Sequence, residues 1–388
     1  RQTSRDTPSV AYTFDANGNR QTMVDPTGTT SYAYDELDRV TSVTSPGSVV
    51  VGYRYDLDGS RRKLIYPNGT AVAYTFDKAD RLQSLQDWAS RTTSYSYTPA
   101  SQLQQVTSFN STAGTYTYDA AQRLTEVNHQ QGGSSFADFQ YTQLDNLGNR
   151  TRAFETLTLP GGRSAFNNLS FVYDHLSQLT QASGYTGGQI LYGYDPAGNR
   201  TSFQQGATTT ATYDRADRVT QVGSTAYTVD PNGNLTQAGS ASYGYDALNR
   251  LTSAGTTYTY DGDGRRATET VSGATTTYVD DVAQAQPAVL TDQTGSVSHT
   301  YVWGLGLAEG VDQAGTVSVP HADGLGSVRA LTDGTGTVVE SYRPDPYGAP
   351  TSTQGSITQP FNFTGQEQDA SDLVYLRARY YSPSLGRY

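Results

Sequence analysis

The sequence contains no cysteine, one methionine and, among its 26 basic residues, only two lysines, Lys63 and Lys78. The absence of cysteine excludes disulfide bonds, thiol nucleophiles and cysteine-based metal sites. Charged residues make up only 16% of the 388 residues, and the net charge is −11. Proteins that bind nucleic acids neutralise phosphates with a basic surface, so this charge balance argues against a nucleic-acid partner.

Long apolar runs are also missing: no stretch approaches 18 consecutive apolar residues, so the sequence predicts no membrane span. Hydrophobic residues amount to 35% even with tyrosine counted, which disfavours a compact core of leucine, isoleucine and valine. The chain nevertheless has 30 tyrosines and 11 phenylalanines, whose rings supply a large apolar area. We therefore expect a tyrosine-rich β structure with much polar surface.

A short unit that ends in aspartate recurs along the chain, at spacings of 15 to 29 residues. In copies such as YTFD, YAYD and YRYD, two aromatic residues flank one other residue before the aspartate. Because side chains alternate along a strand, both aromatic rings lie on the same face. The anchor residues are Asp15, Asp35, Asp56, Asp77, Thr98, Asp119, Asp145, Asp174, Asp195, Asp214, Asp230, Asp246 and Asp261.

Two versions of a turn follow the anchors and alternate along most of the chain. The long version has glycine three residues after the anchor and usually arginine two residues later, as in Gly18 with Arg20, Gly59 with Arg61, and Gly198 with Arg200. The short version has no glycine; a basic or amide residue followed by an aliphatic residue ends the turn, as in Arg39-Val40. We expect the anchor carboxylate to accept backbone N–H groups and glycine to provide the positive φ of a bulge.

The pattern predicts hairpins that follow one another along the chain. Each unit contains two strands of about 5–7 residues, joined at its far end by a second turn such as Pro46-Gly47. Neighbouring units would bring their tyrosines into columns of packed rings, with the hydroxyl groups in solvent. We predict no helix.

The C-terminal ninety residues contain four further motifs: HADGLGSVR (321–329), DPYG (345–348), FNFTGQE (361–367) and YLRARYYSPSLGR (375–387). These motifs resemble the Rhs repeat-associated core. Together with the repeated units, they resemble the YD repeats of Rhs proteins, the C components of Tc toxins and the teneurins. The motif residues that carry this resemblance include His321, Asp323, Gly326, Arg329, Asp345, Gly348, Gly365, Arg377, Arg379, Tyr380, Gly386 and Arg387.

This resemblance implies an all-β fold: a spiralling array of antiparallel β-hairpins that forms a shell, incomplete or open, with little or no helix. Residues 1–300 would form the array and residues 301–388 the core segment, which curls inward. In Rhs proteins and Tc toxins the cavity holds a toxic polypeptide encoded after the core, and aspartates of Asp-Pro motifs release it by self-cleavage. The present sequence stops at Tyr388, where those motifs would begin, so no residue receives that role.

The resemblance therefore favours a non-catalytic shell segment of a large secreted Rhs-type protein. Its partners would be an enclosed C-terminal effector or further YD-repeat segments of the same polypeptide. We expect it in a bacterial protein that is secreted or on the cell surface, with no catalytic residue, cofactor or metal.

The turn residues recur in register, which suits a structural role better than a unique active site. We assign that structural role to Asp15, Asp35, Asp56, Asp119, Asp195, Asp246 and Asp261, with the glycines and arginines of the long turns. The strings Asp56-Leu-Asp-Gly59 and Asp261-Gly-Asp-Gly264 look superficially like calcium loops, yet the glutamate that such loops carry at the twelfth position is absent. The four histidines are far apart and show no metal-binding spacing.

Two alternatives stay open. The chain could be an extracellular structural or adhesive YD-repeat protein that self-associates, forms filaments through its strand edges or binds glycans. Trp88 and Trp303 could then form a sugar platform, although packed aromatic columns are the simpler use of such rings. An enzyme acting on an external substrate is the least supported reading, because the sequence shows no set of non-repeated catalytic residues.

Overall fold

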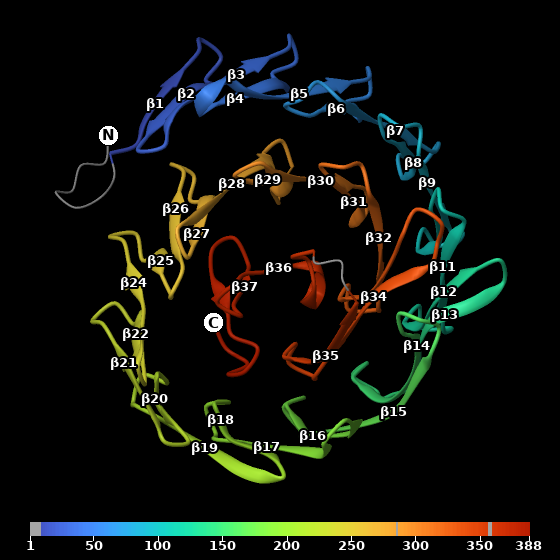
Figure 1. Ribbon diagram of the computed structural model, residues 1–388, viewed down its shortest axis with the longest axis vertical. Coiled ribbons are helices and arrows are strands. Elements are labelled where there is room, and N and C mark those ends of the chain that lie inside the picture. Colours follow the sequence, from blue (N-terminus) through green and yellow to red (C-terminus); the bar gives the residue numbers. More distant parts are fainter. Residues whose placement is uncertain (1–8, 285, 356–358) are drawn as a thin grey trace.

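The protein is all-β, as its sequence predicts, and its strands form one continuous spiral (Figure 1). The computed structural model describes residues 9–284, 286–355 and 359–388. In this part of the chain the only helical segments are the short 3₁₀ turns η1 (Pro46–Ser48) and η2 (Phe363–Gly365). The strands belong to three sheets of 23, 12 and 3 strands.

The 23-stranded sheet forms the outer turn of the spiral. Its strands are β1 (Ala11–Phe14), β2 (Arg20–Asp25), β3 (Gly28–Tyr34), β4 (Val40–Ser45), β5 (Val49–Tyr55), β6 (Arg61–Ile65), β7 (Ala71–Phe76), β8 (Leu82–Gln86), β9 (Thr92–Tyr97), β10 (Leu103–Thr107), β11 (Thr112–Tyr118), β12 (Leu124–Gln131), β13 (Ser134–Leu144), β14 (Arg150–Thr158), β15 (Ser164–Tyr173), β16 (Leu179–Tyr185), β17 (Gly188–Tyr194), β18 (Arg200–Gln205), β19 (Ala207–Tyr213), β20 (Val219–Val222), β21 (Thr225–Val229), β22 (Leu235–Ala238) and β23 (Ala241–Ser242).

The 12-stranded sheet forms the inner turn, and the 3-stranded sheet lies in the C-terminal core, which we define as residues 359–388. The inner turn contains β24 (Gly244–Tyr245), β25 (Leu251–Ser253), β26 (Thr257–Tyr260), β27 (Arg266–Val271), β28 (Ala274–Asp281), β29 (Ala288–Thr294), β30 (Val297–Trp303), β31 (Leu307–Asp312), β32 (Val317–Ala322), β33 (Val328–Thr332), β34 (Val338–Pro344) and β35 (Pro350–Gly355). The core contains β36 (Glu367–Gln368), β37 (Val374–Tyr375) and β38 (Tyr380–Tyr381).

Within each sheet, strands that follow one another in the chain pair antiparallel, for example β3 with β4 and β7 with β8. This meander bends round the outside of the molecule and then passes inside its own beginning, so that β26–β34 lie within the arc of β1–β14 (Figure 1). The C-terminal core occupies the middle (Figure 1). The residue-300 boundary predicted between array and core falls inside β30, so strand pairing continues through it.

One turn geometry underlies both sequence versions, which corrects our division into two kinds of turn. After Asp15 the N–H of Gly18 donates to the Asp15 carbonyl, and Gly18 has φ of 90°. After Asp35 the N–H of Asp38 donates to the Asp35 carbonyl in the same way, and Asp38 has φ of 59°. Aspartate and asparagine tolerate this left-handed conformation better than most residues, so they replace glycine without changing the turn.

The anchor carboxylates act as the sequence predicts. Asp15 Oδ1 accepts the N–H groups of Asn17 at 3.0 Å and Asn19 at 2.8 Å. The strands on either side of the turn also shift in register: Thr13 pairs with Thr22 and Phe14 with Arg20, which leaves Gln21 unpaired as the expected bulge. The aspartate thus fixes the turn and the turn fixes the register.

Tyr66 and Tyr74 of the outer turn are buried, whereas we had predicted that the tyrosine hydroxyl groups lie in solvent. Tyr66 donates to the Tyr301 carbonyl at 2.8 Å, and Tyr74 donates to the Trp303 carbonyl at 3.1 Å. The prediction was wrong because it treated the wall as a single layer. The inner turn covers these tyrosines and replaces water as their hydrogen-bond partner.

Hydrophobic clusters fill the space between the two turns. One cluster joins Leu64 and Val72 of the outer turn to Leu290 and Val302 of the inner turn, and all four side chains are fully buried. A second cluster joins Phe139 and its neighbours to inner-turn residues in the same manner. The core of this protein is therefore the seam between successive turns of the spiral.

Candidate functional site

The seam between the turns also contains buried ion pairs, each linking an outer strand or turn to an inner one. The pair Arg61–Asp281 joins the start of β6 to the end of β28. Arg91 Nε lies 3.0 Å from Glu309 Oε2 on β31, and the Glu309 side chain is fully buried. Each charge meets its partner only where the two turns are in register, so these pairs favour this arrangement over others that would leave a buried charge unpaired.

The pair with most hydrogen bonds involves Arg329 on β33. Its guanidinium donates to Glu155 on β14 at 3.1 and 2.9 Å and to Asp323 at 2.9 Å, and it lies 4.9 Å from the centre of the Phe139 ring. Burial alone would lower the pKa of Arg329, but the two carboxylates raise it above its usual value. Burial likewise opposes ionisation of Glu155, whereas Arg329 holds the pKa of that carboxyl below its ordinary value. Arg329 and Glu155 therefore form a charged pair, and Asp323 provides a further hydrogen-bond acceptor for the guanidinium.

A second buried group balances two carboxylates against one arginine. Arg91 forms ion pairs with both Asp87 and Glu309. Burial and the Asp87 charge raise the pKa of Glu309 to about 7, and Arg91 offsets this rise only in part. Glu309 therefore exchanges its proton near neutral pH.

A third group connects the inner turn to the C-terminal core. Arg266, at the start of β27, pairs with Glu367, and its backbone N–H donates to the Tyr375 hydroxyl at 3.0 Å. Burial raises the pKa of Glu367 to about 7. Beside this pair, Tyr258 donates to Asp369 at 2.6 Å. These contacts anchor the C-terminal core within the spiral.

His321 of the tail motif meets His129 across the seam. The two ring centres lie 5.0 Å apart, and both side chains are buried. His129 Nε2 lies 2.8 Å from the Ala322 carbonyl, and His321 Nε2 lies 2.8 Å from Thr332 Oγ1. Burial lowers the pKa of His129 to about 4 and holds that of His321 well below its usual value. Both rings are thus neutral at physiological pH.

The predicted turn aspartates do not converge on a pocket; they line one rim of the wall, where successive turns contact one another. In a long turn the Asn199 amide donates to its own anchor Asp195 at 2.9 Å and to Asp217 of the following short turn at 2.8 Å. In a short turn Arg39 reaches the carbonyl of the next anchor, Asp56, at 2.8 Å. In these examples a long turn bonds the following short turn through asparagine, and a short turn bonds the following long turn through arginine.

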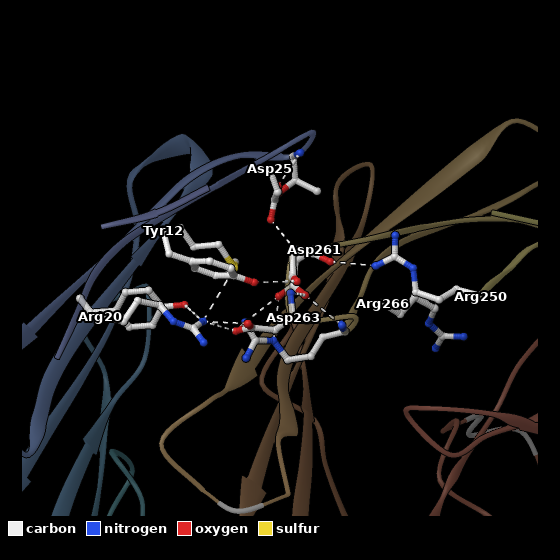
Figure 2. Close-up of polar contacts among 12 residues, drawn as sticks. Tyr12, Arg20, Asp25, Arg250, Asp261, Asp263 and Arg266 are labelled. Carbon is white, nitrogen blue, oxygen red and sulfur yellow. Dashed lines mark hydrogen bonds and ion pairs between the residues drawn. The ribbon is translucent and has the colours of Figure 1, made fainter. Parts of the chain in front are cut away.

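The arginines of the long turns point inward, away from this rim. Figure 2 shows the first of them: Arg20 donates to Asp263 at 2.6 Å where β1 and β2 meet the β26–β27 turn. In the same place Tyr12 donates to the Gly262 carbonyl at 3.2 Å, and the Gly262 N–H donates to Asp25 at 2.5 Å (Figure 2). These contacts close the beginning of the outer turn onto the inner one.

The remaining tail-motif residues gather in and beside the C-terminal core. Gly326, Gly348, Gly365 and Gly386 all have positive φ, and a Cβ at Gly348 would collide with the Phe363 ring. Asp345 anchors a turn in which its carboxylate accepts the N–H of Tyr347 at 2.8 Å, and burial raises its pKa.

The basic and aromatic residues of the last motif hold the end of the chain in place. Arg377 donates to Gln366 at 2.9 Å, and Arg379 lies 5.7 Å from the centre of the Tyr388 ring. The Tyr380 hydroxyl lies 3.2 Å from that of Tyr260. The motif thus lies inside the wall and contacts it at several places.

The C-terminal residues reach the outer turn again near β18. Arg200 donates to the Ser384 carbonyl at 2.8 Å, and Arg387 donates to Asn199 at 2.9 Å and to the Asp217 carbonyl at 3.0 Å. A cleft of about 810 Å³ opens here, and its lining includes Tyr194 and Arg387.

Sequence reasoning missed most acidic members of the seam, including Glu155, Asp281, Glu309 and Glu367. They lie outside the repeated motif, so spacing does not reveal them. One signal was present: Glu309 interrupts the apolar run from Leu307 to Val311. A carboxylate in such a run is expected to be buried, and a buried charge needs a partner.

Among the described residues, no three acidic or histidine side chains are grouped so that they could hold a metal ion. Across the same residues, no helix has the length and apolar character that crossing a bilayer requires. Both tryptophans take part in packing: the ring centres of Trp88 and Tyr66 lie 5.5 Å apart, and those of Trp303 and Phe361 lie 5.1 Å apart. The side chains of the seam bind one turn of the wall to the next.

The comparisons with known proteins agree with this architecture. The sequence model of the Teneurin YD-shell family matches residues 160–388, and that of the RHS repeat matches residues 14–50 and 34–71. The chain belongs to the YD-shell family. It is a β-shell of the Rhs type.

Solved structures share the fold at low sequence identity. A TcdB2-TccC3 crystal structure superposes with a TM-score of 0.77 over 99% of this chain and 24% of that chain, at 17% identity. A Tc holotoxin pore from Photorhabdus luminescens superposes with a TM-score of 0.74 over 98% of this chain and 26% of the other, at 16% identity.

Curated relatives are similar over shorter stretches. The tRNA nuclease WapA of Bacillus subtilis strain 168 is 28% identical over 252 residues, which is 64% of this chain and 9% of that protein. The tRNA(Glu)-specific nuclease WapA of Bacillus subtilis subsp. natto is 32% identical over 135 residues, 34% of this chain and 6% of that protein. The chain thus spans less than a tenth of the length of these relatives.

Proposed function

We propose that this chain is the non-catalytic wall of a bacterial Rhs-type protein and encloses or carries a C-terminal effector. One observation carries the proposal: a continuous antiparallel wall turns its apolar face inward and coils around its own C-terminal core. Such a wall isolates what it surrounds without any chemistry of its own. The division into an array over residues 1–300 and a core segment over residues 301–388 belongs to the same proposal.

The buried charges support a structural and not a catalytic role. Arg329, Glu155 and Asp323 satisfy one another, so none is available to act on a substrate. The curated relatives are tRNA nucleases, but this chain covers 9% of the first of them and carries a net charge of −11. We propose that any such activity belongs to a separate effector and that the shell acts outside the cell that makes it.

The test begins with the intact mass of the native polypeptide and the sequence of its C-terminal peptide. We expect an unrelated domain after the core, and we expect limited proteolysis of the native protein to leave that domain uncut until the wall is denatured. A domain that is cleaved as fast in the native protein as in urea would contradict enclosure.

A second candidate, an extracellular structural or adhesive protein, is favoured by strand β1. Among the described residues β1 pairs only with β2, and its Phe14 side chain is 60% exposed. An exposed strand edge with aromatic side chains can pair with another chain. Filaments or defined oligomers of the purified protein, lost on Phe14→Asp substitution, would support this candidate over enclosure.

A further inference from the structure

Two groups of buried charges lie where one layer of the molecule meets the next, and each contains more carboxylates than guanidinium groups. The β31 group joins the outer turn to the inner turn and consists of Asp87, Arg91 and Glu309. The core group joins the inner turn to the C-terminal core and consists of Arg266, Glu269, Glu367 and Asp369. The carboxylates of both groups are buried.

In the β31 group one arginine serves two carboxylates. Asp87 Oδ1 accepts the main-chain N–H groups of Ala89 and Arg91 at 2.9 and 2.8 Å. Glu309 receives a hydrogen bond from Arg91 Nε to its Oε2 at 3.0 Å, and its Oε1 has no hydrogen-bond partner in the described part of the chain. Two buried carboxylates around one cation leave a net negative charge in the seam, so ionisation of Glu309 is unfavourable there.

Glu155, elsewhere in the same seam, has the partners that Glu309 lacks. Both of its carboxylate oxygens accept hydrogen bonds from Arg329, and the Asn167 amide also donates to it, at 3.3 Å. Arg329 lowers the pKa of Glu155 in spite of burial, whereas burial and the Asp87 charge raise the pKa of Glu309 to about 7. The number of donors thus separates a glutamate that stays ionised from one that keeps its proton.

The core group places three carboxylates around the Arg266 guanidinium. Glu367 pairs with Arg266, and Asp369 Oδ2 lies 3.8 Å from Arg266 Nη1. Burial raises the pKa of Glu367 to about 7, and the charge of Glu269 adds to the rise. Because Glu367 begins β36 of the 3-stranded sheet, this carboxyl lies at the joint between the C-terminal core and the wall.

Other ionisable side chains surround the two glutamates. Tyr66 lies near Glu309. Those near Glu367 are Tyr278, Asp280 and Tyr301. Burial raises the pKa of all three tyrosines, so they stay neutral throughout the physiological range. Burial also raises the pKa of Asp280 to about 6, so this carboxyl titrates in the same direction as the two glutamates.

We propose that protons regulate the packing of the coil. Glu309 and Glu367 are protonated while the layers are packed, and the loss of these protons in alkaline solution loosens β31 from the outer turn and the C-terminal core from the inner turn. The layers are therefore packed more tightly in mildly acidic than in alkaline surroundings. This regulation belongs to the folded wall itself, so it holds for an enclosing and for an adhesive protein alike.

The direction of the effect follows from proton linkage. The pKa of Glu309 is about 7 in the packed state and returns to its ordinary value of 4.5 when the layers separate and water solvates the carboxylate. The packed state therefore binds more protons between these pH values. Its advantage is complete below pH 4.5 and declines as the pH rises to 7, so the equilibrium constant for local opening rises about tenfold per pH unit for each group.

The test measures local opening of the full 388-residue chain by hydrogen exchange and mass spectrometry, with rates corrected for the intrinsic effect of pH on exchange. In the unchanged protein, protection of β31 and of β36–β38 should fall about tenfold between pH 6 and pH 8. Glu309→Gln should remove this fall at β31, and Glu367→Gln should remove it at β36–β38, because glutamine does not ionise.

The matched control is Glu155→Gln, the same substitution in a buried glutamate that Arg329 keeps ionised. This variant should have lower protection at both pH values and should keep the tenfold falls. Two outcomes overturn the proposal: falls in the two glutamine variants that equal those of the unchanged protein, or protection in the unchanged protein that does not depend on pH.

A second measurement does not depend on whether a variant folds. The chain has seven glutamates, so their carbon-13-labelled carboxyl groups can be followed by NMR during a pH titration of the unchanged protein. We expect two of the seven resonances to shift near pH 7. If all seven shift below pH 5.5, the proposal is overturned whatever the variants show.

Discussion

Strands β7 and β21 have nearly the same sequence pattern and different surroundings. In β7, Val72 and Tyr74 face inward and are 0% and 6% exposed. In β21, Thr225 and Tyr227 occupy the corresponding inward positions, counted back from the anchor aspartate, and both are half-buried. The inner turn covers the first strand and does not cover the second.

The difference shows that the repeat makes the wall, whereas the second turn of the spiral makes the core. A hairpin can be built from its own anchor, bulge and strand pairs wherever it lies. Burial of its apolar face, worth about 1.5–3 kcal/mol for a large side chain, comes only when another layer covers it. Stability is therefore concentrated along the covered arc, β3–β17, and low along the uncovered arc, β18–β23.

The largest expected effect is on a buried ion pair of the covered arc. Arg329→Met leaves Glu155 and Asp323 buried without their cation, so we expect the free energy of unfolding to fall by about 4 kcal/mol. Chemical denaturation measures this loss. The matched change Arg218→Met in the uncovered arc breaks a rim pair whose arginine is 39% exposed, and should have no resolvable effect. Equal losses in the two variants would remove the distinction between the arcs.

The next effect compares identical substitutions of leucine. Leu64→Ala in the covered arc removes a fully buried side chain and should cost about 3 kcal/mol, including the cavity that it leaves. Leu235→Ala removes a half-buried side chain of the uncovered arc, and we expect a loss of about 1 kcal/mol. Chemical denaturation of both variants measures the two losses, and equal losses would contradict the comparison.

The sequence predicted the wall well, because its information is local. The anchor Asp15, the positive φ at Gly18 and the bulge after Thr13 all follow from a few adjacent residues. The family motifs added the inward-curling C-terminal core. What the residues alone misjudged was the short turn, where Asp38 takes the conformation that we reserved for glycine.

The seam could not be predicted in the same way, since its partners are far apart in the chain. Glu155 and Arg329 are separated by 174 residues, and neither belongs to the YD unit. The pitch of the spiral decides which residues meet, and no local pattern encodes that pitch. For the same reason no local pattern indicates that the Tyr74 hydroxyl of β7 is covered whereas the ring of Tyr227 is not.

A third effect concerns pH and tests the covered seam alone. Burial lowers the pKa of His129 from its ordinary value of 6.5 to about 4. Between these two pH values the folded protein therefore binds fewer protons than the unfolded chain. Stability from this group is complete above pH 6.5 and is lost as the pH falls towards 4. At pH 5 the loss from His129 is about 2 kcal/mol.

Measurement requires a difference between variants, because other groups titrate in the same range. Facing His129 from the inner turn are His321, whose pKa is also lowered, and Asp323, which is paired with Arg329. The pKa of Glu309 is raised to about 7, so its contribution to the stability of the protein increases as the pH falls, opposite in sign to the contribution of His129. The fall in unfolding free energy between pH 7 and pH 5 should be smaller in folded His129→Gln than in the unchanged protein. An equal fall would show that His129 is not the source.

The smallest effect lies on the rim, where coverage should not matter. Gln122 has φ of 65°, and Gln122→Gly should stabilise the protein by about 0.5–1 kcal/mol, since relief of left-handed strain exceeds the added entropy of the unfolded chain. The contact with the preceding turn survives, because Gln102 donates to the Gln122 main-chain carbonyl. Asp217→Gly relieves less strain, because aspartate tolerates this conformation better than glutamine, and it also loses the bond from the Asn199 amide, so its gain should be smaller. Asn199→Ala is the control: in that background the gain from Asp217→Gly should rise towards that from Gln122→Gly, as measured by thermal unfolding. A gap that stays unchanged without Asn199 would show that the Asn199 bond is not its source.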